Sequence, residues 1–205
     1  MILGGNKYGS EQQLWEAFLS GDNNAFANIF DIYSDSLYSY GKKISPDSEL
    51  VKDTIQDLFV KLYNNRESLN STESVKGYLF TALKRTLYNR LSKSSFLSID
   101  SQDELRFEIE LISDTSNEVN DIEYDDEVKR RLSDALDKLT PRQREAIYLY
   151  YIQEIPLSEI PDILGMNYQS TRNLIHRALL NLRQHFDATV SYAYMSLLLV
   201  QYLSK

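Results

Sequence analysis

Besides Thr171, six residues between positions 169 and 177 have side chains that donate hydrogen bonds, and two of them carry positive charge. They are Gln169, Ser170, Arg172, Asn173, His176 and Arg177. Arg can bind guanine through two hydrogen bonds, and Asn or Gln can bind adenine in the same way. No acidic residue occurs between Asp162 and Asp187. The segment therefore predicts a DNA-contacting surface, the alternative being the solvated polar face of a packing helix.

A second positive run lies upstream, where no acidic residue occurs between Ser74 and Ile99. Its basic residues are Lys76, Lys84, Arg85, Arg90 and Lys93, and the aromatic residues among them are Tyr78, Phe80 and Tyr88. Positive charge beside aromatic rings suits melted nucleic acid, because bases stack on the rings while the cations follow the backbone. For each ring, packing in a hydrophobic core is an equally good interpretation.

The residues before position 169 indicate how the first set is positioned. Ser158 is expected to cap a short helix that has Pro161 in its first turn. Gly165 can take the left-handed conformation of a tight turn, and Asn167 can cap a second helix that runs to about residue 185. The residues of that helix at core spacing are Thr171, Ile175, Ala178 and Leu182. This arrangement is typical of a helix-turn-helix.

Composition favours an all-α fold. The chain has 205 residues, of which 42% are hydrophobic, enough to bury one or two modest cores. Only seven glycines and four prolines are present, which is few for strands and turns. Apolar residues instead recur at intervals of three and four, the spacing of helices.

Negative charge is concentrated in one stretch. Residues 100–127 contain twelve Asp and Glu against one Arg. Since the whole chain carries −8 and this stretch carries −11, the remainder carries +3. The stretch indicates a flexible, self-repelling linker, and an all-carboxylate metal site is the weaker alternative because no calcium-type loop accompanies it.

Three amphipathic helices are expected before the linker, forming one bundle. The first follows Asp22, a candidate N-cap, and ends near Gly41. Its apolar residues are Phe26, Ile29, Phe30, Tyr33, Leu37 and Tyr40; those of the second are Val51, Ile55, Leu58, Phe59 and Leu62; those of the third are Val75, Leu79, Ala82, Leu83, Leu87 and Leu91. The polar run from Asn64 to Ser74 separates the second from the third.

Four short helices are expected after the linker. A helix from Val128 to Leu139 stops before Thr140, which can act as N-cap of the next helix, with Pro141 at its first position and Gln143 completing a capping box. The expected organisation is two small helical domains, 1–98 and 128–187, joined by the acidic linker 99–127. A tail, 188–205, follows.

The tail is almost uncharged and rich in Tyr and Leu. It is too short to span a bilayer. It could form a final helix that packs on one of the two domains, or it could bind a regulator.

Several classes of chemistry lack their residues. The chain has no cysteine and two separated histidines, which excludes disulfides and thiol nucleophiles and does not support a metal site. No glycine loop that could hold phosphate is present. We therefore expect no catalytic residues, no cofactor, no metal and no small-molecule substrate. The N-terminus has no secretory signal pattern, and a cytoplasmic location is expected.

Several motifs together resemble region four of the sigma-70 superfamily. They are residues 139–145, Ser158-Glu159-Ile160, Leu164-Gly165-Met166 and residues 175–183. Residues 21–26 and 53–59 resemble region two, and the two-domain layout resembles the extracytoplasmic-function (ECF) type of sigma factor. The resemblance covers about residues 14–186.

The resemblance implies a transcription initiation factor that binds core RNA polymerase and promoter DNA. It assigns Asp53, Gln56, Asp57 and Lys61 to the polymerase. It assigns Lys76, Lys84, Arg85, Tyr88, Asn89 and Arg90, with the 64–74 loop as acceptor of an extruded base, to the minus-ten element. It assigns the six residues of the first set, Gln169, Ser170, Arg172, Asn173, His176 and Arg177, to the minus-thirty-five element. Related factors are held inactive by anti-sigma proteins, often membrane-tethered, so such a partner is also implied.

A different function class remains open on the sequence alone. In that alternative the chain is a helix-turn-helix regulator whose N-terminal bundle senses a signal or forms a dimer. It would bind its promoter tightly without polymerase.

Overall fold

The computed structural model describes residues 8–72, 74–94, 107 and 126–184, and within these ranges every regular element is a helix. The all-α prediction is confirmed. The chain divides into two compact units, Met1–Asp100 and Ser101–Lys205, and each is described by itself.

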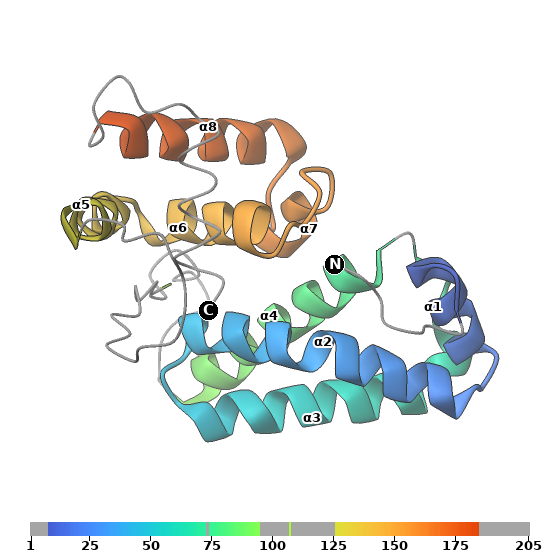
Figure 1. Ribbon diagram of the computed structural model, residues 1–205. Coiled ribbons are helices and arrows are strands. Elements are labelled where there is room, and N and C mark those ends of the chain that lie inside the picture. The colour runs from blue at the N-terminus through green and yellow to red at the C-terminus, as the bar shows by residue number, and fades with distance from the viewer. Residues whose placement is uncertain (1–7, 73, 95–106, 108–125, 185–205) are drawn as a thin grey trace. The chain divides into compact units, whose positions relative to one another are not determined.

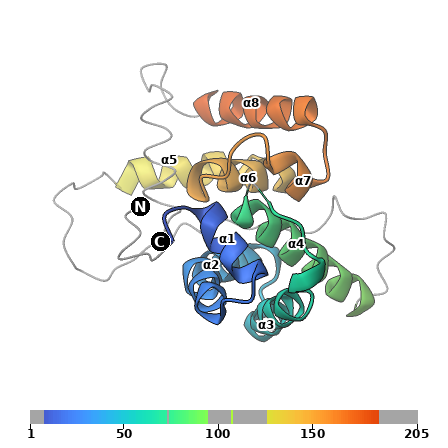
Figure 2. The same cartoon turned by 90° about the vertical axis from the view of Figure 1, so that its right-hand side faces the viewer.

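The first unit contains a three-helix bundle covered at one end by a shorter helix (Figures 1 and 2). The elements are α1 (Glu11–Leu19), α2 (Asn23–Ile44), α3 (Ser48–Asn64), the 3₁₀ turn η1 (Arg66–Ser68) and α4 (Val75–Ser94). Helices α2, α3 and α4 all pack on one another, and α1 contacts α2, α4 and η1. Fully buried side chains at the centre include Tyr40, Phe80 and Leu87.

Helix α1 precedes the first helix predicted from the sequence. Ser10 caps it by accepting a hydrogen bond from the Gln13 N–H. Its buried residues are Leu14, Trp15 and Phe18. Trp15 and Phe18 follow Leu14 by one and four residues. This spacing marks one helix face and could have revealed the helix.

The predicted N-cap of α2 is confirmed, but its predicted end is wrong. Asp22 accepts hydrogen bonds from the N–H groups of Asn24 and Ala25. Helix α2 then continues through Gly41 to Ile44. Gly41 is buried, and a Cβ atom built there would lie 2.6 Å from Cγ1 of Val51. The glycine therefore allows α3 to approach α2 closely and does not end the helix.

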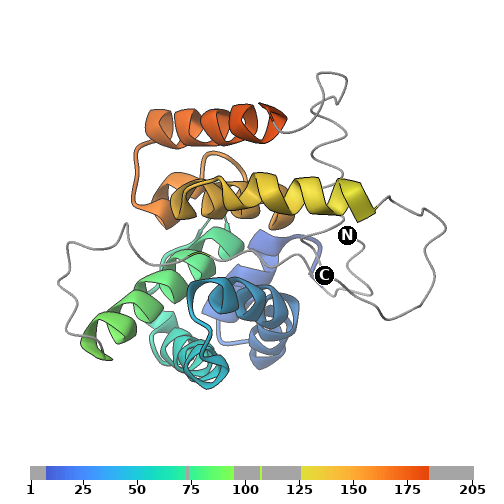
Figure 3. The same ribbon diagram turned by 90° about the vertical axis from the view of Figure 1, so that its left-hand side faces the viewer.

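The second unit contains α5 (Asp126–Asp137), α6 (Pro141–Ile147), the π-helical turn η3 (Tyr148–Ile152), α7 (Ile160–Leu164) and α8 (Tyr168–Gln184). Helix α8 packs on α5, α6 and α7, and Figure 3 shows the short connection from α7 to the orange-red α8. The capping box is confirmed, since Thr140 and Gln143 exchange both of its hydrogen bonds. Helix α5 begins two residues earlier than expected.

Ser158 does not cap α7. The N-cap position is Glu159, whose side chain makes no capping bond, and Pro161 lies in the first turn as expected. The N–H of Asp162 donates instead to the Glu159 carbonyl oxygen, and the Pro156 carbonyl oxygen accepts the N–H groups of Glu159 and Ile160. Backbone hydrogen bonds are therefore found where a side-chain cap was expected.

Phe107 is a described residue inside the predicted linker, and it is not solvated. Its side chain is 3% exposed, and its ring centroid lies 5.6 Å from that of Tyr148 in η3. The interpretation of residues 99–127 as spacer thus does not hold at this position, where an aromatic side chain is packed on the second unit.

The rest of the predicted linker up to residue 125, the 188–205 tail and His185 lie outside the described residues. Among the described helices, none is both long and apolar enough to cross a membrane.

Candidate nucleic-acid interfaces

Helix α8 presents its polar residues on the face opposite the core. Thr171, Ile175, Ala178 and Leu182 are buried. Gln169, Arg172, Asn173, His176 and Arg177 are exposed, and Ser170 is half-buried. The Gln169 amide donates to Oδ1 of Asn173 over 3.2 Å, so these two amides are aligned along the exposed face. Five of the six predicted side chains are thus brought to one accessible surface.

The turn before α8 has the geometry that the sequence predicted. Gly165 is left-handed, with φ of 63°, and Oδ1 of Asn167 accepts the N–H of Ser170 at 2.8 Å. Arg142 of α6 donates to the carbonyl oxygen of Leu164 at 3.2 Å. The orientation of α8 is therefore fixed by a backbone turn, a cap and a link to α6.

Helix α4 exposes fewer of the predicted DNA-contacting side chains than the sequence suggested. Tyr78, Arg85 and Asn89 are exposed, and their spacing of seven and four residues places them on one helix face. Lys84 and Tyr88 are half-buried beside this face, with Nζ of Lys84 5.4 Å from the centre of the Tyr88 ring. Partial desolvation of the Tyr78 hydroxyl raises its pKa above the ordinary value, although the side chain as a whole is exposed.

Three members of the upstream run point elsewhere. Phe80 is fully buried, 5.0 Å from the Tyr40 ring between centroids, so it belongs to the core and not to a base-stacking surface. The ammonium group of Lys76 lies 5.8 Å from the centre of the Phe80 ring. Arg90 pairs with Asp57 of α3.

Helix α3 carries the residues that the resemblance assigned to polymerase. Asp53, Gln56, Asp57 and Lys61 are all exposed. Their spacing of three and four residues places them on one face of the helix. This face also includes Val60, whose exposed fraction is 51%. An apolar residue at the centre of a polar face is a sequence signal that was missed.

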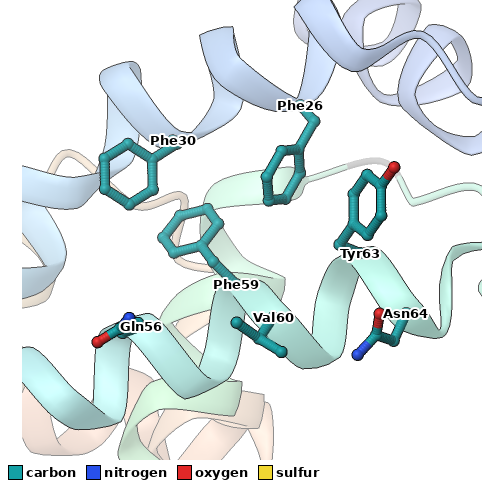
Figure 4. Close-up of a pocket in the computed structure, with 7 residues that line it drawn as sticks. All are labelled: Phe26, Phe30, Gln56, Phe59, Val60, Tyr63 and Asn64. Atoms are coloured by element: carbon teal, nitrogen blue, oxygen red, sulfur yellow. The ribbon is translucent and has the colours of Figure 1, made fainter.

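Beside Val60 lies an apolar groove between α2 and α3, with a volume of about 360 Å³ (Figure 4). The residues that line it are Phe26, Phe30, Gln56, Phe59, Val60, Tyr63 and Asn64. The Phe30 and Phe59 rings are 4.9 Å apart between centroids, yet Phe30 remains 42% exposed. Apolar side chains gathered at a surface mark protein-binding sites. The prediction that Phe30 faces the core is therefore wrong.

Within the described part of the chain, no group of three or more His, Asp or Glu residues is arranged to hold a metal ion.

A helix-turn-helix with a basic exposed face, together with a separate bundle that has a basic helix, is typical of a DNA-binding protein. Residues 29–96 match the family model for sigma-70 region 2, and residues 135–184 match the model for sigma-70 region 4. The chain belongs to the sigma-70 superfamily and is a sigma factor of the ECF type, a transcription initiation factor and not an enzyme.

Curated relatives support this assignment. The chain is 25% identical over 165 residues to the ECF RNA polymerase sigma factor SigW of Bacillus subtilis (strain 168), which covers 77% of this chain and 86% of that protein. It is 25% identical over 170 residues to the ECF RNA polymerase sigma factor SigK of Mycobacterium ulcerans (strain Agy99). This match covers 82% of this chain and 89% of SigK.

Two solved structures share the fold. One is CnrH in complex with the cytosolic domain of CnrY, with a TM-score of 0.56, 19% identity, and coverage of 88% of this chain and 99% of that one. The other is the sigma factor RpoE in complex with the anti-sigma factor NepR from Bartonella quintana, with a TM-score of 0.54, 20% identity, and coverage of 80% and 98%.

Proposed function

We propose that α8 reads the minus-thirty-five element and α4 the minus-ten element of promoters. The observation that carries the first assignment is the exposed row on α8, where Arg172, Asn173 and Arg177 lie on the capped second helix of the helix-turn-helix. A recognition helix of this kind enters the major groove with its N-terminal half. Helix α4 offers Tyr78, Arg85 and Asn89, which suit unpaired bases and their backbone.

The exposed face of α3 is proposed to bind core RNA polymerase. Asp53, Gln56, Asp57 and Lys61 supply polar contacts, and the adjoining groove supplies the apolar centre that a protein interface needs. Gln56 belongs to both, so the polar row and the groove form one continuous surface. We name this surface the α3 face, made of Asp53, Gln56, Asp57, Val60, Lys61 and the groove.

An anti-sigma protein is proposed as a second partner. The support is that two proteins of similar fold were solved with bound partners, one of them the sigma factor RpoE with the anti-sigma factor NepR. We further propose a cytoplasmic location, since the polymerase works there. An anti-sigma protein that covered the α3 face would exclude the polymerase, and a competition assay would detect this.

Variants of the α3 face test the polymerase assignment. Val60→Asp puts a charge at the exposed apolar centre, and Asp53→Ala removes one polar contact. We expect the affinity of the full chain for core polymerase to fall about tenfold or more for Val60→Asp, because a buried unpaired charge costs at least ~1.4 kcal/mol. Thermal stability should change little, since Val60 is already half exposed.

Asp35→Ala is the control, because Asp35 is an exposed residue of α2 that neither lies on α3 nor lines the groove. Equal affinities for Val60→Asp, Asp53→Ala and Asp35→Ala would show that the polymerase binds elsewhere.

A further inference from the structure

Trp15 joins helix α1 to the loop between α3 and α4. Its indole Nε1 donates to the backbone carbonyl oxygen of Asn70 at 3.1 Å, and the side chain is only 1% exposed. On its other side, the ring lies 5.6 Å from the Tyr78 ring between centroids. Trp15 therefore contacts both the loop and the first turn of α4.

Glu11 joins the same helix to the start of α4. Its Oε1 accepts the backbone N–H of Lys76 at 3.0 Å and the hydroxyl of Tyr33 at 2.7 Å. A carboxylate at this position satisfies one of the first N–H groups of α4 and complements the positive end of the helix dipole. Burial raises the pKa of Tyr33, so its hydroxyl remains a neutral donor. One carboxylate thus connects α1, α2 and α4.

The remaining hydrogen bonds that join described residues of the loop are local. The Ser68 N–H donates to the Asn65 carbonyl at 2.9 Å, and the Thr72 hydroxyl donates to the Ser74 carbonyl at 3.1 Å. Such bonds shape short turns but do not fix where the loop lies. Among the hydrogen bonds between described residues, the one from Trp15 to Asn70 ties the loop to a distant helix, and η1 within the loop packs on the same helix, α1.

We propose that Trp15 and Glu11 are positioning residues for minus-ten recognition. They hold the loop residues 65–72 and the start of α4 in the conformation in which Tyr78, Arg85 and Asn89 meet unpaired bases. A loop fixed in advance loses less conformational entropy on binding, so it discriminates better between correct and incorrect bases. This inference rests on the proposed function, because it presupposes that α4 reads the minus-ten element.

The test uses the full chain with core RNA polymerase on a template library randomised around the minus-ten position. Trp15→Phe keeps a buried aromatic ring and removes the N–H donor, together with part of the buried volume of the indole. Glu11→Ala removes the acceptor, whereas Glu11→Gln keeps one acceptor oxygen. We expect Trp15→Phe and Glu11→Ala to reduce the preference for the favoured bases about three- to tenfold, the effect of one hydrogen bond. Glu11→Gln should restore most of the preference, and polymerase affinity should stay constant.

Phe18→Leu is the control for a purely structural role. Phe18 is fully buried on α1, 5.3 Å from Trp15 between ring centroids, and its other described ring contact is Phe26. We expect this variant to lower the thermal midpoint and keep the base preference. Phe18→Leu could instead reduce the minus-ten base preference as much as Trp15→Phe does. Trp15 would then act only through the folding of α1, as Phe18 does, and the proposal would be overturned.

Arg85→Ala and Asn89→Ala separate this proposal from the one on which it rests. If both left the minus-ten preference intact, the assignment of α4 would fail. If they reduced it while Trp15→Phe and Glu11→Ala did not, only the positioning role would fail.

Discussion

The carboxylate of Asp57 in α3 pairs with the guanidinium of Arg90 in α4. A residue assigned to polymerase and a residue assigned to promoter DNA are thus each other's partners. The two side chains are 51% and 30% exposed, respectively. An exposed pair of this kind contributes about 0–1 kcal/mol to stability, so either residue can exchange its partner for a ligand at little cost.

A double-mutant cycle with Asp57→Asn and Arg90→Gln tests whether Asp57 acts mainly as the partner of Arg90 or as a polymerase contact. We expect a coupling of about 1 kcal/mol or less in the free energy of unfolding. Asp57→Asn should also weaken polymerase binding, and it should do so equally when Arg90 is Gln. If the loss disappears in the Arg90→Gln background, Asp57 acts by orienting Arg90 and not by touching the polymerase.

Arg172→Ala and Arg177→Ala test the recognition helix. A side chain that reads a base should lose roughly 1–3 kcal/mol of discrimination at one position of the minus-thirty-five element. A side chain that touches phosphate should instead lower the salt dependence of promoter binding by about 0.9 in the log–log slope. Promoter binding by the polymerase complex at several salt concentrations measures both.

Gln184→Ala, an exposed position at the other end of α8, is the control for the recognition helix and should have no effect on either quantity. Unchanged promoter binding in both arginine variants would contradict the groove assignment.

Gly41→Ala tests the close approach of α2 and α3. The added methyl group would lie 2.6 Å from the buried side chain of Val51. Overpacking costs roughly 1–3 kcal/mol, and the better helix propensity of Ala returns about 1 kcal/mol. We expect a lower thermal midpoint of the first unit, measured by circular dichroism.

Val51→Ala in the same chain makes room for the added methyl group. Gly41→Ala should therefore be less harmful in the Val51→Ala background. Equal losses in the two backgrounds would show that Gly41 is not required by packing.

We expect the second unit to lose stability at alkaline pH because of Tyr148. Burial raises the pKa of Tyr148 from 10.0 to about 12. The unfolded chain therefore releases this proton first, so the stability is present below pH 10 and is lost as the pH rises from about 10 to about 12. Thermal unfolding of the second unit at neutral and alkaline pH measures the loss.

Tyr148→Phe should make the alkaline loss smaller. At neutral pH it should lower the stability by about 1–3 kcal/mol, since it leaves the buried Gln153 amide without its hydroxyl acceptor. An alkaline loss as large in the variant as in the natural chain would assign it to other groups.

The helix-turn-helix could be predicted from the sequence because local signals determine it. Gly165 favours the left-handed turn, Asn167 caps α8, and Thr140 with Gln143 forms a capping box. Each of these acts over a few residues, so the spacing alone reveals it. The same holds for Asp22 at the start of α2.

Tertiary contacts decided the features that could not be predicted. Gly41 lies inside α2 because Val51 of α3 packs where its side chain would be. Phe30 is exposed, although its spacing in the sequence is that of a core residue. Arg90 turns to Asp57, which is 33 residues away in the sequence. Trp15 reaches Asn70 across 55 residues. Such pairs leave no periodic pattern in one sequence.

Run-off transcription tests the central claim most directly. The full chain is combined with core RNA polymerase on a template library randomised at both the minus-ten and the minus-thirty-five positions. The account predicts transcripts only when both proteins are present, with one preferred sequence at each element; Arg172→Ala should alter only the minus-thirty-five preference and Asn89→Ala only the minus-ten preference. Transcription that does not depend on the chain, or variants that alter both preferences alike, would contradict it.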